Sequence, residues 1–351
     1  MENTGFITFG EIMMRLTAPD CEKIVQAKGF DANYGGSEAN IAVSLANLGI
    51  KSSVITVLPD NPLGQSVLKM LKSNDVDTGR VILAKKDEVK THRLGVYYME
   101  KGFGIRPGNV IYDRKNSCIT EYDFGELDPR EILKGYSWFH VSGISLAISS
   151  SCREFAFELI KTAKEMGLTV SFDGNFRSAL WTFEEARDCC SKCLPYVDVL
   201  FGIEPFNLYR EKDNKGSGDL KEDIPFQPDK KQQEEVFKAF TDRYPNIKCI
   251  ARHVRYTKSG NENSLKAYIF MNDKTYESSL YTFDILDRVG GGDAFIAGFI
   301  YAYLKGFAPE ETAEFAVAAS VIKHTIKGDI NVTNNESDIR AIMGKNFDIK
   351  R

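Results

Sequence analysis

Short runs of β-branched and aromatic residues alternate along this chain with longer segments in which apolar residues recur every three or four positions. The short runs predict strands, and the longer segments predict helices with one buried face. The expected strands are residues 6–9, 54–57, 138–141, 169–172, 197–201 and 249–254. The expected helices are residues 38–48, 152–166, 184–194, 232–243 and 309–324. This order predicts an α/β fold with a mostly parallel central sheet, whose ligands gather at the carboxyl ends of the strands.

Three stretches depart from this alternation. Residues 12–34 and 91–120 are rich in β-forming and turn residues but lack a helical period, which predicts a small antiparallel sheet standing off the main body. Residues 211–231 mix charged residues with glycine and proline, so we expect a mobile surface loop there. The length allows two domains or one large domain, and we expect a single α/β domain over residues 1–351 that carries these insertions.

The charge pattern and the hydropathy pattern exclude two classes of partner. A net charge of -4 with dispersed basic residues offers no footprint for nucleic acid. The longest apolar run, residues 294–304, is about half of the ~20 residues that a membrane-spanning helix needs. Acidic Glu2 and Glu11 occupy the N-terminal region in place of a basic signal segment. We therefore expect a cytoplasmic protein.

The most specific chemistry lies where Gly290, Gly291 and Gly292 precede Asp293 and an apolar helix. Three glycines can turn the chain tightly and aim backbone N–H groups at an anion, and the N-terminus of the helix adds a partial positive charge. An unpaired carboxylate would repel a phosphate, so Asp293 fits better as the proton acceptor for an alcohol. We expect its pKa to be low at the start of a helix. The segment predicts a kinase of small alcohols.

A glycine turn followed by an aspartate is also common, without any function, wherever a loop enters a helix. However, residues 287–293 resemble the signature of the ribokinase-like, phosphofructokinase B-type sugar kinases, with Arg288 in place of Thr and Gly291 in place of Ala. Residues 35–40, Gly-Gly-Ser-Glu-Ala-Asn, resemble the second signature of that family. The resemblance implies a three-layer αβα sandwich with a β lid over the sugar, ATP and Mg²⁺ as cofactors, and a homodimer or higher homo-oligomer formed through the lid.

Several arginines and tyrosines lie together in the second insertion: Arg93, Tyr97, Arg106, Tyr112 and Arg114. A guanidinium group binds a carboxylate through two parallel N–H bonds, whereas a neutral hexose gains little from it. The cluster therefore favours an acid sugar as substrate. Alternatively, arginines on a thin sheet are simply solvated or paired across strands.

Asp173, Asn175 and Arg177 follow a predicted strand and should project from its carboxyl end. Together with Gly95-Val96-Tyr97 and Tyr112-Asp113-Arg114, this segment resembles the 2-keto-3-deoxygluconate kinases within the same family. By this resemblance, Asp293 would take the proton from the terminal hydroxyl of the sugar acid, giving the 6-phosphate. The residues implied to hold that sugar acid are Gly36, Tyr97, Tyr112, Arg114 and Arg177.

One departure from the family concerns magnesium. Many ribokinase-like enzymes carry Asn-x-x-Glu near residue 200, where it helps to hold Mg²⁺ and the phosphates, but here residues 203–206 are Ile-Glu-Pro-Phe. No direct metal ligand follows from the sequence, and Asp173, Asn175 and Glu204 are the candidates for supporting metal and phosphates through water. Two other functions stay open: a kinase of a neutral ketose such as fructose or of a nucleoside, and a sugar-binding regulator without turnover.

Overall fold

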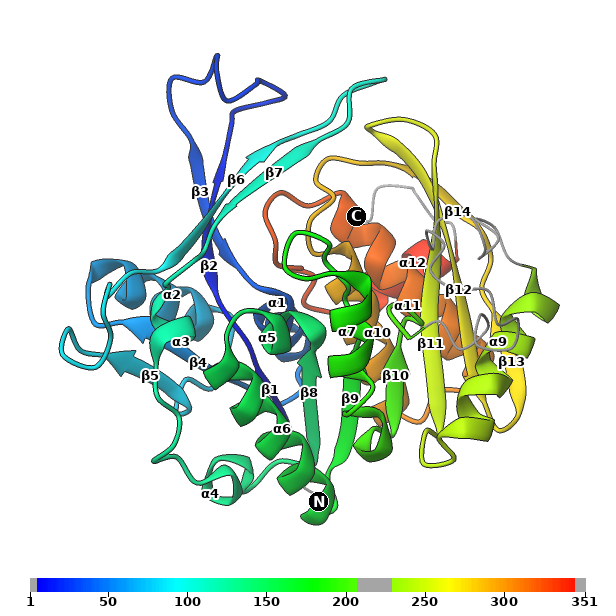
Figure 1. Ribbon diagram of the computed structural model, residues 1–351. Helices are drawn as coiled ribbons and strands as arrows, with labels where there is room; N and C mark the ends of the chain where they lie inside the picture. Colours follow the sequence, from blue (N-terminus) through cyan, green and yellow to red (C-terminus); the bar gives the residue numbers. More distant parts are fainter. Residues whose placement is uncertain (1–4, 207–228, 345–351) are drawn as a thin grey trace.

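The computed structural model describes residues 5–206 and 229–344 (Figure 1), so residues 211–228 of the expected surface loop lie outside the described residues. The central sheet has ten strands in the order β13-β12-β11-β10-β9-β8-β1-β4-β5, with β14 paired to β12. These strands are β1 (Phe6–Phe9), β4 (Ser52–Pro59), β5 (Val81–Ala84), β8 (Trp138–Ser142), β9 (Thr169–Asp173), β10 (Val199–Phe201), β11 (Cys249–Thr257), β12 (Glu262–Met271), β13 (Lys274–Glu277) and β14 (Tyr281–Asp284). All neighbours from β5 to β11 are parallel, and β12 is antiparallel to its partners. The expected mostly parallel sheet is confirmed.

Helices cover both faces of this sheet and complete three layers. One face carries α1 (Ser37–Asn47), α2 (Pro62–Ser73), α10 (Gly291–Leu304), α11 (Pro309–His324) and α12 (Glu336–Met343). The other carries α3 (Cys118–Glu121), α4 (Pro129–Leu133), α5 (Gly143–Ala147), α6 (Ser150–Glu165), α7 (Phe183–Cys190), the 3₁₀-helix η1 (Leu194–Tyr196) and α9 (Lys230–Arg243). The helix expected at residues 184–194 ends at Cys190, because Pro195 has no N–H with which to continue it. Within the described ranges, no helix is long and apolar enough to cross a membrane.

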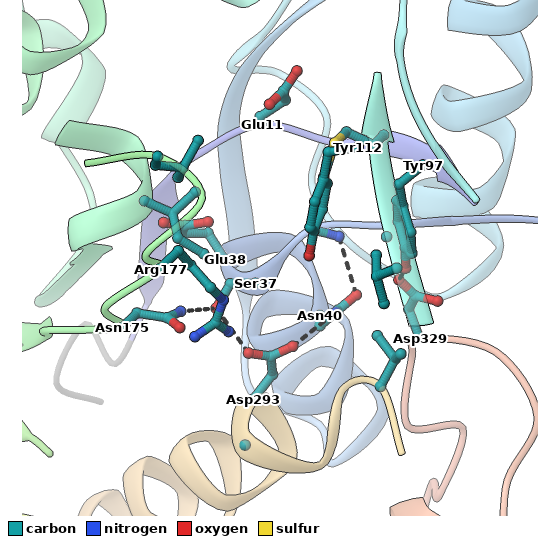
Figure 2. Close-up of a pocket in the computed structure, with 18 of the residues that line it drawn as sticks. Glu11, Ser37, Glu38, Asn40, Tyr97, Tyr112, Asn175, Arg177, Asp293 and Asp329 are labelled. Atoms are coloured by element: carbon teal, nitrogen blue, oxygen red, sulfur yellow. Dashed lines mark hydrogen bonds between the residues drawn. The ribbon is translucent and has the colours of Figure 1, made fainter. Parts of the chain in front are cut away.

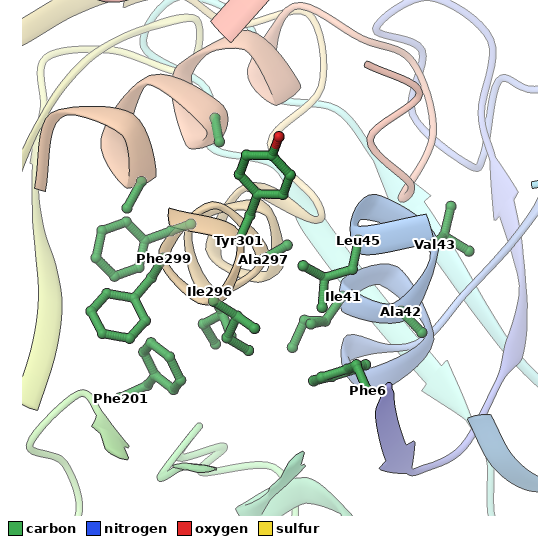
Figure 3. Packing of buried hydrophobic residues seen from close by; sticks show 14 of the residues in the cluster. Phe6, Ile41, Ala42, Val43, Leu45, Phe201, Ile296, Ala297, Phe299 and Tyr301 are labelled. Atoms are coloured by element: carbon green, nitrogen blue, oxygen red, sulfur yellow. The ribbon is translucent and has the colours of Figure 1, made fainter. Parts of the chain in front are cut away.

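The core places two helix N-termini at the same edge of the sheet. Successive strand residues face opposite layers, so Phe6 packs beneath α1 and α10 while Ile7 joins the other layer. Figure 3 shows Ile41 of α1 and Ile296 of α10 facing each other above the strands. Burial of each such side chain contributes ~1.5–3 kcal/mol to stability. The first turns of α1 and α10 are thereby held side by side at the carboxyl ends of the strands.

A second sheet of four strands stands off this end of the molecule (Figure 1), and we call it the lid sheet. Its order is β3-β2-β6-β7, formed by β3 (Asp31–Gly35), β2 (Met13–Thr17), β6 (Gly95–Glu100) and β7 (Asn109–Asp113). The outer pairs are antiparallel and the central pair is parallel. The loop between β6 and β7 reaches the loop between β11 and β12, where Gly260 N–H donates to Gly104 O over 2.6 Å. This hydrogen bond connects the lid sheet to the β11–β12 end of the central sheet.

Candidate active site

A cavity of about 910 Å³ lies between the lid sheet and the carboxyl ends of the central strands. It is lined by residues of the lid sheet, of the first turns of α1 and α10, of the loop after β9 and of β11. The predicted site residues that line it are Gly36, Tyr97, Tyr112, Arg114, Asp173, Asn175, Arg177, Gly290, Gly292 and Asp293. Two predicted residues, Gly291 and Glu204, do not line it.

Asp293 lies in the first turn of α10 and is held by the first turn of α1 (Figure 2). Ser37 Oγ donates to Asp293 Oδ1 over 2.7 Å, and Asn40 Nδ2 donates to Asp293 Oδ2 over 2.7 Å. Asn175 Nδ2 in turn donates to Ser37 Oγ over 3.0 Å. Both carboxylate oxygens are therefore fixed in direction, and residues from three distant parts of the chain orient them.

The expectation of a low pKa for Asp293 is wrong. Loss of contact with water raises the pKa of this carboxyl above its ordinary value, and the hydrogen bonds from Asn40 and Ser37 only partly oppose this effect. Arg177 also lowers the pKa of Asp293, but desolvation is the largest of the effects on this carboxyl. A raised pKa makes the ionised carboxylate a stronger proton acceptor, as general-base catalysis requires.

The three glycines do not form one flexible loop. Gly290 has φ +82° and a Cβ at this position would overlap the backbone oxygen of Asp329, so only glycine fits there. The helix already begins at Gly291, where a Cβ would overlap the ring of His324, and Ser320 Oγ donates to Gly291 O over 2.7 Å. Gly291 thus serves the packing of α10 on α11. Gly290 and Gly292 face the cavity, beside N–H groups that have no partner within the helix.

The predicted sugar-binding residues surround the lid side of the cavity. At Gly36, a Cβ would overlap the backbone oxygen of Glu11, so the chain approaches too closely for any other residue. The Tyr97 hydroxyl donates to Asp329, and only 4% of the Tyr97 surface is exposed. The Tyr112 ring lies 5.6 Å from the Tyr97 ring and is 44% exposed. One wall of the cavity is therefore aromatic.

The arginines of the second insertion form ion pairs or hydrogen bonds within the fold, and the prediction that Arg114 holds the sugar acid stays a prediction, because Arg114 also lines the cavity. Arg114 Nε donates to Glu11 Oε2 over 2.8 Å, and its Nη2 forms an ion pair with the same oxygen. Arg93 pairs with Asp113 over 2.9 Å, and Arg106 donates to a backbone oxygen. By contrast, Arg177 donates to the backbone oxygen of Phe176 over 3.1 Å and forms no ion pair within the described ranges.

Asp173 is the most suitable of the three residues predicted to support metal and phosphates. Its Oδ1 accepts from Asn175 N–H over 2.9 Å, and desolvation raises the pKa of Asp173 to about 7. A cation bound beside it would favour its ionised form. Glu204 does not line the cavity, and its carboxylate lies 3.7 Å from Arg252 with 43% of its side chain exposed. In the part of the chain that the structure describes, no three His, Cys, Asp or Glu residues form a metal cluster.

A buried ionic network beneath the cavity was not predicted. Arg15 is fully buried and donates to Asp329 Oδ1 over 2.9 Å and to Asp287 Oδ2 over 2.7 Å. It joins strand β2 of the lid sheet to the turn before α10 and to the segment after α11, where Asp329 also accepts from Tyr97. Ser37 and Asn40 belong to the segment that resembles the second family signature, but the sequence predicts no role for them. The sequence predicts no ion pair for Arg15 or Asp329, because their partners are distant along the chain.

With this geometry, the chain can be compared with known proteins. The sequence profile of the pfkB family carbohydrate kinases matches residues 3–205 and 247–336. This chain belongs to that family, and it is a carbohydrate kinase that uses ATP and a sugar. The predicted ribokinase-like fold and the resemblance of the two signatures are confirmed.

Among the similar proteins are kinases named for particular sugar acids. The chain is 31% identical over 345 residues to a 2-dehydro-3-deoxygalactonokinase of Haloferax volcanii, with 98% of both chains covered. The crystal structure of a 2-dehydro-3-deoxygluconokinase from Thermotoga maritima superposes with a TM-score of 0.87 at 35% identity, covering 97% of this chain and 99% of that one. A putative ribokinase II from E. coli in complex with ATP and Mg²⁺ superposes with a TM-score of 0.76 at 19% identity, covering 97% and 99%, which is a likeness of fold alone.

Proposed function

We propose that this chain transfers the γ-phosphoryl group of ATP to the terminal hydroxyl of 2-keto-3-deoxygluconate, giving the 6-phosphate. The proposal rests on one observation: Asp293, held by Ser37 and Asn40, shares its cavity with Arg177, a cation without an ion pair in the described residues. A carboxylate base suits an alcohol, and a guanidinium that forms no direct ion pair suits an acid. Relatives named for 2-keto-3-deoxy sugar acids, also called 2-dehydro-3-deoxy sugar acids, support this choice.

In the proposed reaction, Gly36, Tyr97 and Tyr112 hold the sugar and Arg177 binds its carboxylate. Asp293 accepts the proton of the terminal hydroxyl as its oxygen forms a bond to the γ-phosphorus. The bond between that phosphorus and the bridging oxygen breaks, and ADP leaves with the bonding electrons. N–H groups at the start of α10, beside Gly290 and Gly292, stabilise the charge on the transferred group. The lid sheet excludes water, which would otherwise accept the phosphoryl group.

The residues present also fit a magnesium ion. Mg²⁺ takes oxygen ligands and is commonly bound by one or two carboxylates, several waters and the phosphates of the substrate. Asp173 offers a carboxylate on the cavity wall, and Asn175 lies beside it. When bound, Mg²⁺ neutralises part of the charge on the phosphates. We assign Asp173 and Asn175 to its support, and Glu204, which does not line the cavity, stays a candidate for support through water.

We also propose a homodimer that forms through the lid sheet. Large apolar side chains are exposed on and around its strands: Val25, Phe30, Phe103, Ile105 and Ile111. Exposed apolar side chains favour contact with a second surface, and a second copy of the chain would cover them symmetrically. We place the enzyme in the cytoplasm, where ATP is available.

The first test is release of ADP from Mg-ATP with 2-keto-3-deoxygluconate, its galactonate epimer, fructose, ribose and adenosine in parallel. The Asp293→Asn variant serves as the blank. Turnover of the sugar acids alone would support the proposal, and the ratio of the two epimers would define the substrate. Turnover of a neutral sugar would contradict the role of Arg177, and no turnover of any sugar would contradict the assigned reaction.

A further inference from the structure

Three guanidinium groups line the cavity without an ion pair in the described residues: Arg177, Arg255 and Arg288. Their situation differs from that of Arg15 and Arg114, each of which contacts a carboxylate directly. Arg288 Nη2 donates to the amide oxygen of Asn263 over 3.4 Å. Arg177 interacts electrostatically with Asp173 and Asp293, which line the same cavity, so Arg255 and Arg288 are the two guanidinium groups that still need an anion.

The position of Arg255 follows from the length of β11. Strand β10 ends at Phe201, which pairs with Ala251 of β11. Strand β11 is longer and continues to Thr257, and its residues after Ala251 are paired with β12. Ala251 packs in the core beneath α10, and alternate residues of a strand share one face. His253, next on that face, packs against Phe295 in the first turns of α10 at 4.9 Å between ring centres. Arg255 is two residues further along the same face of β11, so it lies beyond the N-terminus of α10 and lines the cavity.

The surroundings of Arg255 leave part of its side chain unsatisfied. Its Nε is buried and has no hydrogen-bond partner among the described residues. Desolvation, with repulsion from Arg288 and Arg177, lowers the pKa of Arg255 to about 10. Buried donors that lack a partner are rare, because each one costs free energy. An anion bound between these arginines would accept from the open N–H groups and remove the repulsion.

The order of the strands indicates which anion this is. Strand β11 is separated from β1 by β10, β9 and β8. The sugar-binding side lies toward β1 and the lid sheet, where Tyr97 and Glu11 line the cavity. Arg288 precedes the turn at Gly290 whose N–H groups face the transferred phosphate in the proposed reaction. Arg255 and Arg288 therefore occupy the side from which a phosphoryl donor would approach Asp293.

We propose that Arg255 and Arg288 bind the phosphates of ATP and complete its binding site at the β11 end of the cavity. The inference rests on the proposed function only in taking ATP as the donor. A guanidinium fork matches phosphate oxygens and binds them with two parallel N–H bonds. Arg255 and Arg288 would add positive charge beside the phosphates in a chain that lacks Asn-x-x-Glu at residues 203–206.

The test measures binding of Mg-ATP and Mg-ADP by titration calorimetry without any sugar, so it does not depend on turnover. The variants are Arg255→Met, which keeps the apolar bulk, and Arg288→Thr, which carries the residue usual in the family signature. Arg130→Ala serves as the matched control, because Arg130 is exposed and pairs with Glu165 outside the cavity. We expect the Kd for ATP to rise at least tenfold in each cavity variant and to stay within twofold in the control. Binding of AMP should change less than binding of ATP, because the contacts are to the outer phosphates.

Thermal unfolding of the free protein separates a binding role from a structural one. Removal of an unsatisfied, repelled guanidinium should leave the Tm of Arg255→Met unchanged or raise it. A Kd for ATP within twofold of wild type would overturn the proposal, and so would a loss of sugar-acid binding without a loss of ATP binding. A lower Tm with unchanged ATP binding would show that Arg255 is structural. If no sugar is phosphorylated but ATP binding responds as expected, the proposed function fails and this inference stands.

Discussion

Replacement of Asp293 by asparagine tests the centre of the proposed reaction with little disturbance of the structure. Asn40 Nδ2 can still donate to the amide oxygen, and Ser37 Oγ can accept from the new amide N–H group. The sugar and the nucleotide should therefore bind with nearly unchanged affinity. Only the proton acceptor is lost.

The expected magnitude follows from that loss. A positioned general base contributes about 10²–10⁴-fold to a rate, which corresponds to ~2.7–5.4 kcal/mol of transition-state stabilisation at 1.36 kcal/mol per tenfold. We expect kcat of Asp293→Asn to fall by this factor while KM for the sugar changes less than threefold. Release of ADP, followed in a coupled assay, measures both. A variant with kcat within tenfold of wild type would refute the role of Asp293.

The same substitution predicts a change in stability with a definite sign. The pKa of Asp293 is raised in the folded protein, whereas in the unfolded chain a carboxyl has its ordinary pKa of about 3.9. Between these two values the folded state holds more protons, so the free energy of unfolding falls as pH rises through this window. An asparagine side chain does not titrate, and Asp293→Asn should unfold at a Tm equal to or above that of wild type near neutral pH. A lower Tm would contradict the desolvation argument.

Three further substitutions test the surroundings. Arg177→Ala should raise KM for a sugar acid at least tenfold but leave KM for ATP within threefold; equal effects would mean that Arg177 does not bind the sugar carboxylate. Arg15→Met leaves two buried carboxylates without their cation and should lower the free energy of unfolding in urea by about 3–5 kcal/mol, and a loss below about 1 kcal/mol would show that they find another partner. Gly36→Ala places a Cβ against the backbone oxygen of Glu11 and should abolish sugar binding in calorimetry, whereas normal binding would show that this backbone can shift.

Much of the fold was predictable from local patterns. The strand expected at residues 6–9 and the helix expected at residues 309–324 have the bounds of β1 and α11. These elements depend on the spacing of apolar residues and on short-range backbone preferences, which neighbouring residues set. Their order also determined which ends of the strands carry the site. The predicted end of the helix at residue 194 was wrong, because Pro195 follows it directly and the helix has already ended at Cys190.

The position of the site was equally predictable, since Gly36, Arg177 and Asp293 belong to recognisable segments and do meet in one cavity. The ionisation states of these groups and their ion pairs could not be predicted, because the partners are distant along the chain. Glu11 lies 103 residues from Arg114, and Asp329 lies 314 residues from Arg15.

The sequence by itself therefore determined the elements, their order and the chemistry of the family. Only the tertiary structure decided which charges are compensated. Arg114 is neutralised by Glu11, Arg177 and Arg255 form no ion pair in the described ranges, and the pKa of Asp293 rises instead of falling. The physical reason is that secondary structure arises from neighbours along the chain, whereas desolvation and Coulomb interaction depend on neighbours in space, and folding alone brings those together.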